Sequence, residues 1–595
     1  MQNASWLALA LMLAAAPATA QQATDAVAPE TGEAPAGAAV SMMTEVAPPA
    51  TANDWMVAAA NPLAVEAGAR VLREGGSAAD AMIAVQAVLG LVEPQSSGLG
   101  GGAFLVWYDA ETGALTTLDG RETAPMDATP LLFQTEGEAM GFFDAVVGGL
   151  SVGTPGTPAL MEAAHRRWGR HNWGDLFSDA IGLAEDGFAV SPRLAGAIAE
   201  DEERLTTFGP ASDYFFPGGA ALAEGATLRN PAYAETLRAI AAEGAAAFYE
   251  GPIAEGIVAA VRGSTGVTGK EGLLSLEDLA AYEVIERPAV CAPYRGAEVC
   301  GMGPPSSGAL TVGQILMMLE PYDIGAMGPD DPEAWRLIGD ASRLAFADRG
   351  LYMADSDFVP MPDLLDPAYL QGRAELIGGD DALPEVTAGS PPWDHAALDA
   401  APIWAPGWSP ERPSTSHISI VDADGNALSM TTTIEGGFGA KVLAPGGFLL
   451  NNELTDFSFS THEDGRPVAN RVEPGKRPRS SMAPTIVLRD GAPVFVVGSP
   501  GGSRIIGYVA KTVVAHMDWG MDPQAAVALP HLVNRFGAYD LEAGTAAEGL
   551  AEPLAAMGFE TEVRDLNSGL HAIAITEDGL LGGADPRREG VAVGE

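Results

Sequence analysis

A threonine at the junction of two dissimilar segments could act as a nucleophile in this sequence. Thr415 follows residues 393–414, a Pro-, Trp- and Ala-rich stretch without regular period, and it opens a strand-like run crowded with small hydroxyl side chains. The Thr415 hydroxyl could attack the carbonyl carbon of Ser414 and shift the acyl group from nitrogen to oxygen. Hydrolysis would then expose the α-amine of Thr415 beside its own hydroxyl, as a built-in base. Considered alone, a threonine at the start of a strand is most often structural.

The protonation state of such an α-amine decides whether it can serve as a base. Its reference pKa is about 7.7–8.0, so only about a tenth is unprotonated at pH 7, and the site should lower this pKa. His417 is a rival base, because a step of two residues along a strand returns to the same face. We expect a structural role for His417, since neighbouring side chains on one strand face can diverge.

The elements around Thr415 are predicted from hydrophobic period and turn residues. Residues 416–421 and 427–434 flank an Asp-Gly turn and predict a β-hairpin. Ser77 and Asp80 have the spacing of a capping box at a helix start. Further strands are predicted at 103–109, 447–451, 484–489 and 493–497. Helical spacing predicts helices within 62–76, 77–92, 157–190, 231–262, 333–353 and 503–517.

The composition is that of a globular protein with a strongly acidic charge balance. The chain has 595 residues, of which 47% are hydrophobic, so it can bury a sizeable core. It has 79 acidic against 32 basic side chains, a net charge of −47 that would repel nucleic acid. The glycine cluster at residues 98–102 lies after a helical stretch and before a strand, the reverse of a dinucleotide-binding loop. We therefore expect no nucleic-acid partner, and we expect no cofactor.

The N-terminal residues have the pattern of an export signal followed by a tether. Residues 1–20 contain a short apolar run and end in the small residues Ala-Thr-Ala, as before a secretory cleavage site. Residues 21–54 are rich in Ala, Pro, Thr and Glu without periodic apolar positions, which predicts disorder. The apolar run is too short for a stable membrane span, and no later stretch reaches span length without charges. We therefore expect the protein in the periplasm or outside the cell.

The two cysteines, Cys291 and Cys300, are placed symmetrically about the pair Arg295-Gly296. If that pair forms a two-residue hairpin turn, the cysteines face each other across two strands at disulfide distance. A cross-strand disulfide would agree with an oxidising compartment. The alternative is two free thiols on a strand pair that has a different turn.

Six motifs in a fixed order give the sequence a resemblance to a known family. They are GGSAADAMIAVQAVLGLVEPQSSGLGGGAFL, LDGRETAP, TSHISIVDADGNALSMTTTI, FLLNNELTDFS, PGKRPRSSMAPTIV and GSPGGSRII. Each motif alone is a weak signal, but together they resemble the γ-glutamyltranspeptidase family of N-terminal nucleophile hydrolases. The resemblance implies an α+β fold, a four-layer αββα sandwich made as one precursor. That precursor would cut itself between Ser414 and Thr415 into a large subunit, residues 55–414, and a small subunit, residues 415–595, which stay together as a heterodimer.

The same resemblance implies catalytic roles for residues of these motifs. Thr415 would be the nucleophile, and Thr433 would hydrogen-bond to it. Gly501 and Gly502 precede a predicted helix, where backbone N–H groups can stabilise an oxyanion. Without the resemblance, the two glycines would be interpreted as a helix-entry turn.

A γ-glutamyl donor carries an α-carboxylate and an α-ammonium at the end remote from the amide that is cut. By resemblance, Arg121 would bind the carboxylate, helped by the hydroxyls of Ser480 and Ser481. Glu453 and Asp456 would accept hydrogen bonds from the ammonium. These residues therefore predict a pocket that contains both signs of charge.

Three departures from better-known members of the family bear on this pocket. Glu435 stands where several relatives have Asn, and it adds a carboxylate near the donor ammonium. Gly120 replaces a larger residue before Arg121, which predicts looser packing there. Residues 456–480 form a shorter stretch than in members with a full lid loop and contain no Tyr or Trp, which predicts a more open pocket.

The activity that the resemblance implies is that of a γ-glutamyltransferase or glutathione hydrolase. Thr415 would form an acyl-enzyme with glutathione or another γ-glutamyl compound, and water or an amino-acid or peptide acceptor would resolve it. One alternative is an acylase of glutaryl or cephalosporin-like amides on the same scaffold, which would not need Glu453 and Asp456. Another is an inactive secreted binding protein, which would be expected to have lost Thr415 or the glycine pair.

Overall fold

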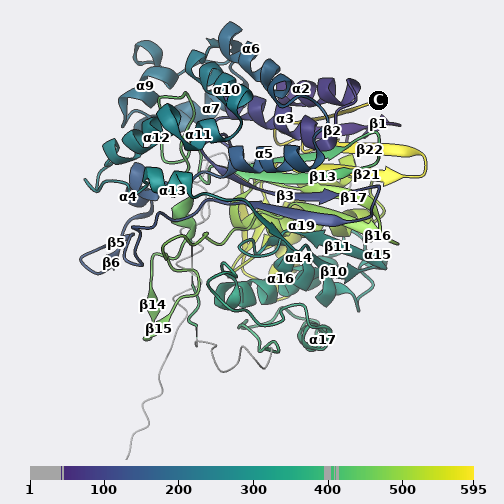
Figure 1. The fold of residues 1–595 in the computed structure, drawn as a ribbon. Coiled ribbons are helices and arrows are strands. Elements are labelled where there is room, and N and C mark those ends of the chain that lie inside the picture. Colours follow the sequence, from purple (N-terminus) through teal and green to yellow (C-terminus); the bar gives the residue numbers. More distant parts are fainter. Residues whose placement is uncertain (1–41, 43–45, 394–403, 408, 410–413) are drawn as a thin grey trace, which may run out of the picture.

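The computed structural model describes residue 42 and residues 46–393, 404–407, 409 and 414–595. Within these residues, two large antiparallel sheets lie face to face and are flanked by helices on both outer sides (Figure 1). The predicted signal, residues 1–20, lies outside the described residues, as does most of the predicted connector 393–414. No helix in the described part of the chain is long and apolar enough to cross a membrane.

The first sheet contains the predicted hairpin at its centre. Its strand order is β23 (Val591–Gly594), β2 (Met56–Ala59), β12 (Ser416–Val421), β13 (Ala427–Thr433), β3 (Gly102–Tyr108), β4 (Leu115–Gly120) and β9 (Ile285–Arg287). The hairpin prediction is confirmed as β12 and β13, and the strand predicted at 103–109 as β3. The register pairs Ser416 with Thr432, so Thr415 comes opposite Thr433.

The second sheet covers one face of the first. Its strand order is β1 (Ala50–Ala52), β22 (Gly579–Ala584), β21 (His571–Thr576), β17 (Ala492–Gly498), β16 (Thr485–Arg489), β11 (Ala297–Gly301) and β10 (Val290–Tyr294). The strands predicted at 484–489 and 493–497 are confirmed as β16 and β17. The strand predicted at 447–451 is wrong, because there Leu449 and Leu450 form only isolated bridges, to Leu443 and Gly100.

The predicted disordered tether is wrong at its C-terminal end, where β1 forms. Residues 21–54 were expected to be disordered, but Ala50–Ala52 pair with β22 along the edge of the sheet. An edge strand can be held by backbone hydrogen bonds alone, so a short Ala-Thr-Ala segment needs no apolar period to join it. Most of the remaining tether, residues 21–41 and 43–45, lies outside the described residues.

The alternation of side chains along the strands explains how the layers are filled. In β2, Val57 and Ala59 face the first helical layer, whereas Met56 and Ala58 pack between the sheets. The same alternation directs Ile418 and Ile420 of β12 toward the helices. The odd-numbered residues of this strand, and Thr415 before it, therefore face the second sheet.

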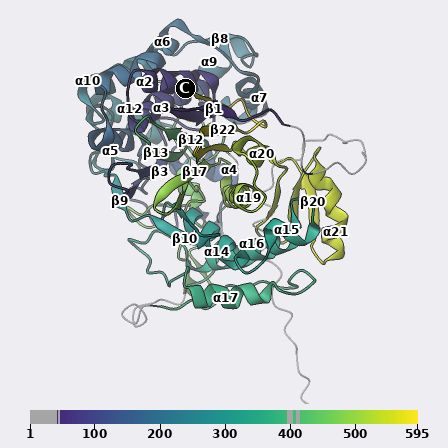
Figure 2. The same cartoon turned by 90° about the vertical axis from the view of Figure 1, so that its right-hand side faces the viewer.

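The helices form two outer layers, and in both views α2 and α3 lie on one side of the sheets while α14 and α16 lie on the other (Figure 1 and Figure 2). The first layer contains α2 (Pro62–Arg73), α3 (Ala78–Val92), α5 (Thr157–Trp168), α6 (Ser178–Asp186), α10 (Pro231–Glu243) and α12 (Gly251–Gly263). The second contains α14 (Gly308–Leu319), α16 (Pro332–Tyr352), α17 (Pro367–Leu376), α19 (Ile505–Met517), α20 (Pro523–Ala528) and α21 (Ala551–Ala556). The capping box of Ser77 and Asp80 starts α3, as predicted.

Two long helical predictions are broken into shorter helices. Residues 157–190 give α5, a short 3-10 turn and α6, and residues 231–262 include a break at Gly244, whose φ of 77° ends α10. The remaining helices of the described residues are α4 (Phe142–Val146), α7 (Pro192–Glu200), α8 (Glu202–Leu205), α9 (Gly209–Phe215), α11 (Ala246–Tyr249), α13 (Leu276–Ala280) and α15 (Ile324–Met327). The minor strands are β5 (Gln134–Thr135), β6 (Glu138–Ala139), β7 (Phe188–Ala189), β8 (Thr227–Leu228), β14 (His462–Glu463), β15 (Arg466–Pro467), β18 (Leu532–Asn534), β19 (Tyr539–Glu542) and β20 (Thr561–Arg564).

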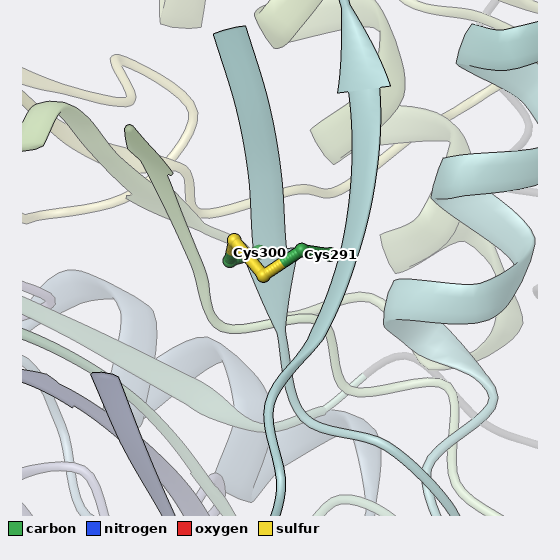
Figure 3. The surroundings of a disulfide bond; sticks show 2 residues. All are labelled: Cys291 and Cys300. Atoms are coloured by element: carbon green, nitrogen blue, oxygen red, sulfur yellow. A yellow bond between two sulfur atoms is a disulfide. The ribbon is translucent and has the colours of Figure 1, made fainter. Parts of the chain in front are cut away.

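The predicted disulfide is confirmed between β10 and β11 (Figure 3). Cys291 and Cys300 are direct cross-strand partners, with their Cα atoms 4.0 Å apart. The turn between the strands is Arg295-Gly296, and both residues have positive φ, 50° and 72°, as a two-residue hairpin turn of type I′ requires. The disulfide therefore closes a hairpin at the edge of the second sheet.

Candidate active site

The two threonines predicted to act together are in direct contact. Thr415 Oγ1 lies 2.9 Å from Thr433 Oγ1, at the end of the hairpin where the two strands open toward a pocket. Thr433 Oγ1 also accepts a hydrogen bond of 2.8 Å from the backbone N–H of Glu435. Because that N–H can only donate, the Thr433 hydroxyl hydrogen remains available for Thr415. Both threonines are buried, so the contact is shielded from bulk water.

The backbone around Thr415 is held in an unusual conformation. Thr415 has a φ of 88°, a region that a β-branched residue rarely adopts and that costs about 1–3 kcal/mol. Its carbonyl accepts a 2.9 Å hydrogen bond from Arg588 Nη1, and the preceding Ser414 hydroxyl donates to the Gln95 carbonyl at 2.8 Å. Hydrogen bonds thus hold the chain on both sides of the Ser414–Thr415 peptide bond, and that bond adjoins a residue with strained backbone.

A pocket beside Thr415 collects nearly all the predicted site residues. Gly501 is the one predicted pocket residue that is not in its wall, although it directly precedes Gly502. Sequence reasoning did not identify Met482 and Ile505, whose apolar side chains carry no recognisable chemical signal. The lining residues are Arg121, Thr415, Thr433, Glu435, Glu453, Asp456, Ser480, Ser481, Met482, Gly502 and Ile505.

Arg121 and the two predicted ammonium acceptors are paired with one another. Glu453 and Asp456 lie three residues apart on a single 3-10 turn, Glu453–Asp456, which puts both side chains on one side. Arg121 donates from Nη1 to Glu453 and from Nη2 to Asp456, and from Nε to the Pro478 carbonyl at 3.2 Å. The family resemblance predicts that the arginine binds the α-carboxylate of a ligand and that the two acids bind its α-ammonium. The structure instead places them in one buried ion-pair cluster.

Burial raises the pKa values of two carboxyl groups in and beside this cluster. Burial raises the pKa of Glu453 well above its usual range, although Arg121 opposes the shift. Burial also raises the pKa of Glu122 to about 7, again against the charge of Arg121. Among the described residues, no group hydrogen-bonds to Glu453 Oε2. Glu453 thus keeps an acceptor oxygen for a further hydrogen-bond donor, and the Glu122 carboxyl interacts with the same side chain.

The serine pair is held by partners that sequence reasoning did not identify. Ser481 Oγ accepts from Arg349 Nη2 at 2.7 Å, and Arg349 Nε reaches Ser307 Oγ at 2.8 Å. Ser480 Oγ accepts from the backbone N–H of Met482 at 3.1 Å. Since a hydroxyl that accepts still has its own hydrogen to donate, both serines can present that hydrogen to an anion in the pocket.

The glycine pair lies where the second sheet passes into α19. Gly501 has a φ of 136°, and a Cβ there would lie 2.7 Å from the Tyr508 ring, so both conformation and packing require glycine. Gly502 has a φ of 59° and opens a short 3-10 turn that leads into α19. Backbone N–H groups at such a helix entry are suited to binding an anion, and Gly502 borders the same pocket as Thr415.

The rival base His417 is occupied elsewhere. Its Nδ1 lies 2.9 Å from Thr431 Oγ1 and its Nε2 lies 3.0 Å from Ser419 Oγ, in the space between the sheets. Burial, and to a lesser extent His571, hold the pKa of His417 well below its usual value, so the ring is neutral. A Cβ at Gly498 would come within 2.2 Å of the ring. His417 therefore packs between the sheets, in agreement with the structural role expected for it.

Two of the positions that depart from better-known family members, Gly120 and Glu435, are closely packed. The looser packing predicted at Gly120 is wrong, because a Cβ there would lie 2.8 Å from Leu160 Cδ1, so Leu160 fills the space. Glu435 has a φ of 73°, and its carboxylate hydrogen-bonds to the amide of Asn452. That contact turns Glu435 toward the loop that carries Glu453.

Sequence reasoning also missed three charged residues around the site. Glu122 could have been noticed, because it directly follows Arg121. Arg349 lies within α16 and Arg588 near the C-terminus, far from every motif that suggested chemistry. Their contacts with Ser481 and Thr415 depend on tertiary packing, which no local pattern encodes.

The chain is similar over most of its length to proteins of one family. The sequence pattern described as Gamma-glutamyltranspeptidase matches residues 64–595. A glutathione hydrolase proenzyme of Bacillus subtilis (strain 168) is 38% identical over 91% of this chain and 92% of its own. An Acylase ACY 1 proenzyme of Pseudomonas sp. (strain V22) is 34% identical over 90% of this chain and 92% of its own. The solved structure of a cephalosporin acylase from Bacillus halodurans superposes with a TM-score of 0.81, at 26% identity, over 96% of this chain and 99% of that chain.

Proposed function

Because the chain belongs to the gamma-glutamyltranspeptidase family, we propose that it is a self-cleaving γ-glutamyltransferase and glutathione hydrolase with Thr415 as its N-terminal nucleophile. One observation carries the proposal: the Thr415 hydroxyl contacts the Thr433 hydroxyl at the wall of a pocket that also holds the Arg121 ion-pair cluster. That arrangement combines a nucleophile with a recognition site for a zwitterion.

The first step is cleavage of the chain. Thr415 Oγ attacks the carbonyl carbon of Ser414, the C–N bond to Thr415 breaks, and an ester forms in its place. Water then hydrolyses the ester and leaves a carboxylate on Ser414 and a free α-amine on Thr415. The strained φ of Thr415 favours this step, because breaking the peptide bond releases the strain.

The cleaved chains remain joined because both build each sheet. The small subunit supplies β12 and β13, which pair with β2 and β3 of the large subunit. In the second sheet, β16 of the small subunit pairs with β11 of the large one. We propose that the four-layer sandwich is that of an N-terminal nucleophile hydrolase, formed jointly by residues 55–414 and 415–595.

The mature site then transfers the γ-glutamyl group. The α-amine takes the proton from Thr415 Oγ, which attacks the γ-carbonyl carbon of the donor. The N–H groups of Gly501 and Gly502 stabilise the oxyanion, and one such donor is typically worth about 2.7–4 kcal/mol. The proton passes to the leaving amine, and water or an amino-acid or peptide acceptor releases the acyl group from Thr415.

Donor binding exchanges one set of ion pairs for another. In the uncut chain, Arg121 is neutralised by Glu453 and Asp456. The donor α-carboxylate binds Arg121 and the hydroxyls of Ser480 and Ser481, while its α-ammonium takes over the two acids. A zwitterion supplies both charges at once, so no buried charge is left without a partner.

This exchange predicts a strong preference for donors with an ammonium group. A glutaryl amide has the same carboxylate and scissile bond, but it draws Arg121 from Glu453 and Asp456 without replacing it. Leaving a buried acceptor uncompensated costs at least about 1–3 kcal/mol. We expect kcat/KM for a γ-glutamyl anilide to exceed that for the glutaryl anilide by about tenfold to several hundredfold, at about 1.4 kcal/mol per tenfold.

The same assay decides between the two candidate activities. The acylase alternative is supported by the similarity to the Pseudomonas and Bacillus halodurans acylases. Equal rates, or a faster glutaryl reaction, would assign the chain to that class and remove the proposed role of the acids. Hydrolysis of neither anilide by cleaved protein would contradict both.

A second prediction concerns the hydroxyl that supports the nucleophile. Thr433→Val keeps the shape of the side chain but removes its hydrogen bond to Thr415. We expect kcat/KM to fall by about 10–100-fold, the equivalent of about 1–3 kcal/mol. The matched control is Thr432→Val on the opposite face of β13, since the Thr432 hydroxyl has no hydrogen-bond partner among the described residues. A similar loss in both variants would contradict the special role of Thr433.

The cellular location is also part of the proposal. The signal-like residues 1–20 and the Cys291–Cys300 disulfide both support an exported protein in an oxidising compartment, the periplasm or the medium. Fractionation of the native host, with the small subunit detected by antibody, tests this assignment. Recovery only with cytosolic markers would contradict it.

A further inference from the structure

Arg588 contacts Thr415 although it lies outside the six sequence motifs of the family. It lies just beyond β22, near the end of the chain, and is buried. Its Nη1 donates to the Thr415 carbonyl at 2.9 Å, and its Nε donates to Asn567 Oδ1 at 3.1 Å. One guanidinium group thus bridges the start of β12 and the loop 566–569.

The loop that Arg588 holds packs in turn against the glycine pair. A Cβ at Gly569 would lie 2.6 Å from Pro500 Cγ and 2.7 Å from Arg588 Cδ, so the bare glycine is sandwiched between them. Pro500 directly precedes Gly501 in the chain. Displacement of the Arg588 side chain would therefore disturb both the nucleophile and the segment proposed to stabilise the oxyanion.

Arg588 forms no direct ion pair with a carboxylate among the described residues, although Glu93 and Asp585 act on its charge at longer range. In the described part of the chain, its two hydrogen bonds go to neutral oxygens and it takes part in no ion pair. The nearby acids have other cations: Glu93 lies 3.5 Å from Arg193, and Asp585 lies 3.0 Å from Arg587. Burial, and then Arg193, lower the pKa of Arg588 to about 9, so the group still carries its charge at pH 7.

Cleavage places a second cation close to this charge. The α-amine and the carbonyl of Thr415 are joined through one Cα atom, so the amine lies within about 7 Å of the guanidinium nitrogen. A like charge at such a distance favours the neutral amine. The carboxylates of Glu435, Glu453 and Asp456 favour the protonated amine. The charge of Arg121 favours the neutral amine, as that of Arg588 does. The other ionisable groups of the described residues that interact electrostatically with Arg588 are Glu93, Arg193, Tyr508, His571 and Asp585. Glu589 acts on Glu93 in turn.

We propose that Arg588 is a positioning residue that fixes the Thr415 carbonyl relative to the glycine pair and, through its charge, keeps the Thr415 α-amine in its basic form. The inference rests on the proposed function, because it requires that Thr415 be released as an N-terminus. Arg588 would thus both fix the position of the Thr415 carbonyl and lower the proton affinity of the Thr415 α-amine. These two roles can be separated by substitution.

The test is the pH dependence of kcat/KM, whose acid limb reports the pKa of the base in the free enzyme. Arg588→Met keeps the aliphatic stem and removes the charge, so we expect the acid limb to move up by about one to two pH units. Arg588→Lys keeps a charge but cannot bridge both oxygens, so we expect a lower kcat with the limb within about 0.3 units of the parent. Arg193→Met is the matched control, because it removes a cation of the same cluster that does not contact Thr415.

The outcomes separate this inference from the proposed function. If the parent protein cleaves neither itself nor a γ-glutamyl anilide, the proposed function has failed. If the parent is active but Arg588→Met has an unmoved limb, or Arg193→Met moves it equally, only the role of Arg588 has failed. Where Arg588→Met yields no cleaved protein, Arg588→Lys and Asn567→Ala decide the matter. Both should lower kcat with an unmoved limb, and an unchanged kcat in both would overturn the positioning role.

Discussion

Replacing Thr415 with alanine is expected to leave one uncut chain without γ-glutamyl transfer activity. The variant lacks the oxygen that we propose attacks the Ser414 carbonyl, so neither the ester nor the new N-terminus should form. Removing the nucleophile of a hydrolase lowers kcat on the order of 10⁶-fold, which is below detection in a chromogenic assay. Denaturing gel electrophoresis and the anilide assay measure the two effects on one preparation.

The matched control for this prediction is Thr415→Ser. Serine keeps the oxygen but lacks the methyl group that adds to the cost of a φ of 88°, so the backbone strain is smaller and we expect cleavage that is complete but slower. Thermal unfolding of Thr415→Ala should show a folded chain, since the lost hydroxyl contacts one other side chain. Efficient cleavage of folded Thr415→Ala would contradict the assignment of Thr415.

Replacing Arg121 with methionine is expected to destabilise the fold by about 3–5 kcal/mol, the usual cost of leaving buried charges without their partner. The variant strips the cation from Glu453 and Asp456, which are almost completely buried. The loss should be measured in the Thr415→Ala background, where a single uncut chain unfolds. Urea denaturation followed by tryptophan fluorescence gives the free energy of unfolding.

The effect of Arg121→Met should also depend on pH. Burial raises the pKa of Glu453 well above its usual value even beside Arg121, and removing Arg121 raises it further, so the folded state binds more protons than the unfolded state. Stability is then lost as pH rises from about 4 through the raised pKa of Glu453, and the difference from the parent should be larger at pH 8 than at pH 5. Adding Glu453→Gln and Asp456→Asn should restore most of the stability at pH 8. An equal loss at both pH values would show that the three charges are not coupled.

The central hairpin, the helix starts and the disulfide could be predicted because each has a local signal. The Asp-Gly turn between two apolar runs specified β12 and β13, and the symmetry of Cys291 and Cys300 about Arg295-Gly296 specified β10 and β11. In contrast, β1 has no apolar period and forms because β22 offers it backbone partners. The strand predicted at 447–451 does not form. Its apolar residues pack in the hydrophobic core but make only isolated bridges to other segments.

Most residues of the pocket could be predicted, but their mutual arrangement could not. The motifs identified Arg121, Glu453 and Asp456 as groups that would each meet one charge of a ligand. The structure shows that they meet one another, because three buried charges in one site are stabilised only as pairs. The contact between Arg588 and the Thr415 carbonyl joins residues far apart in the sequence. No periodicity or spacing could have indicated it.

Mapping of the acyl group after the purified enzyme reacts with a γ-glutamyl anilide tests the central claim most directly. The reaction is quenched with acid, the chains are digested, and the peptides are analysed by mass spectrometry. We expect a small subunit that begins at Thr415 and carries one γ-glutamyl group as an ester on its N-terminal residue. An uncut chain, or a γ-glutamyl group on any other residue, would contradict the account.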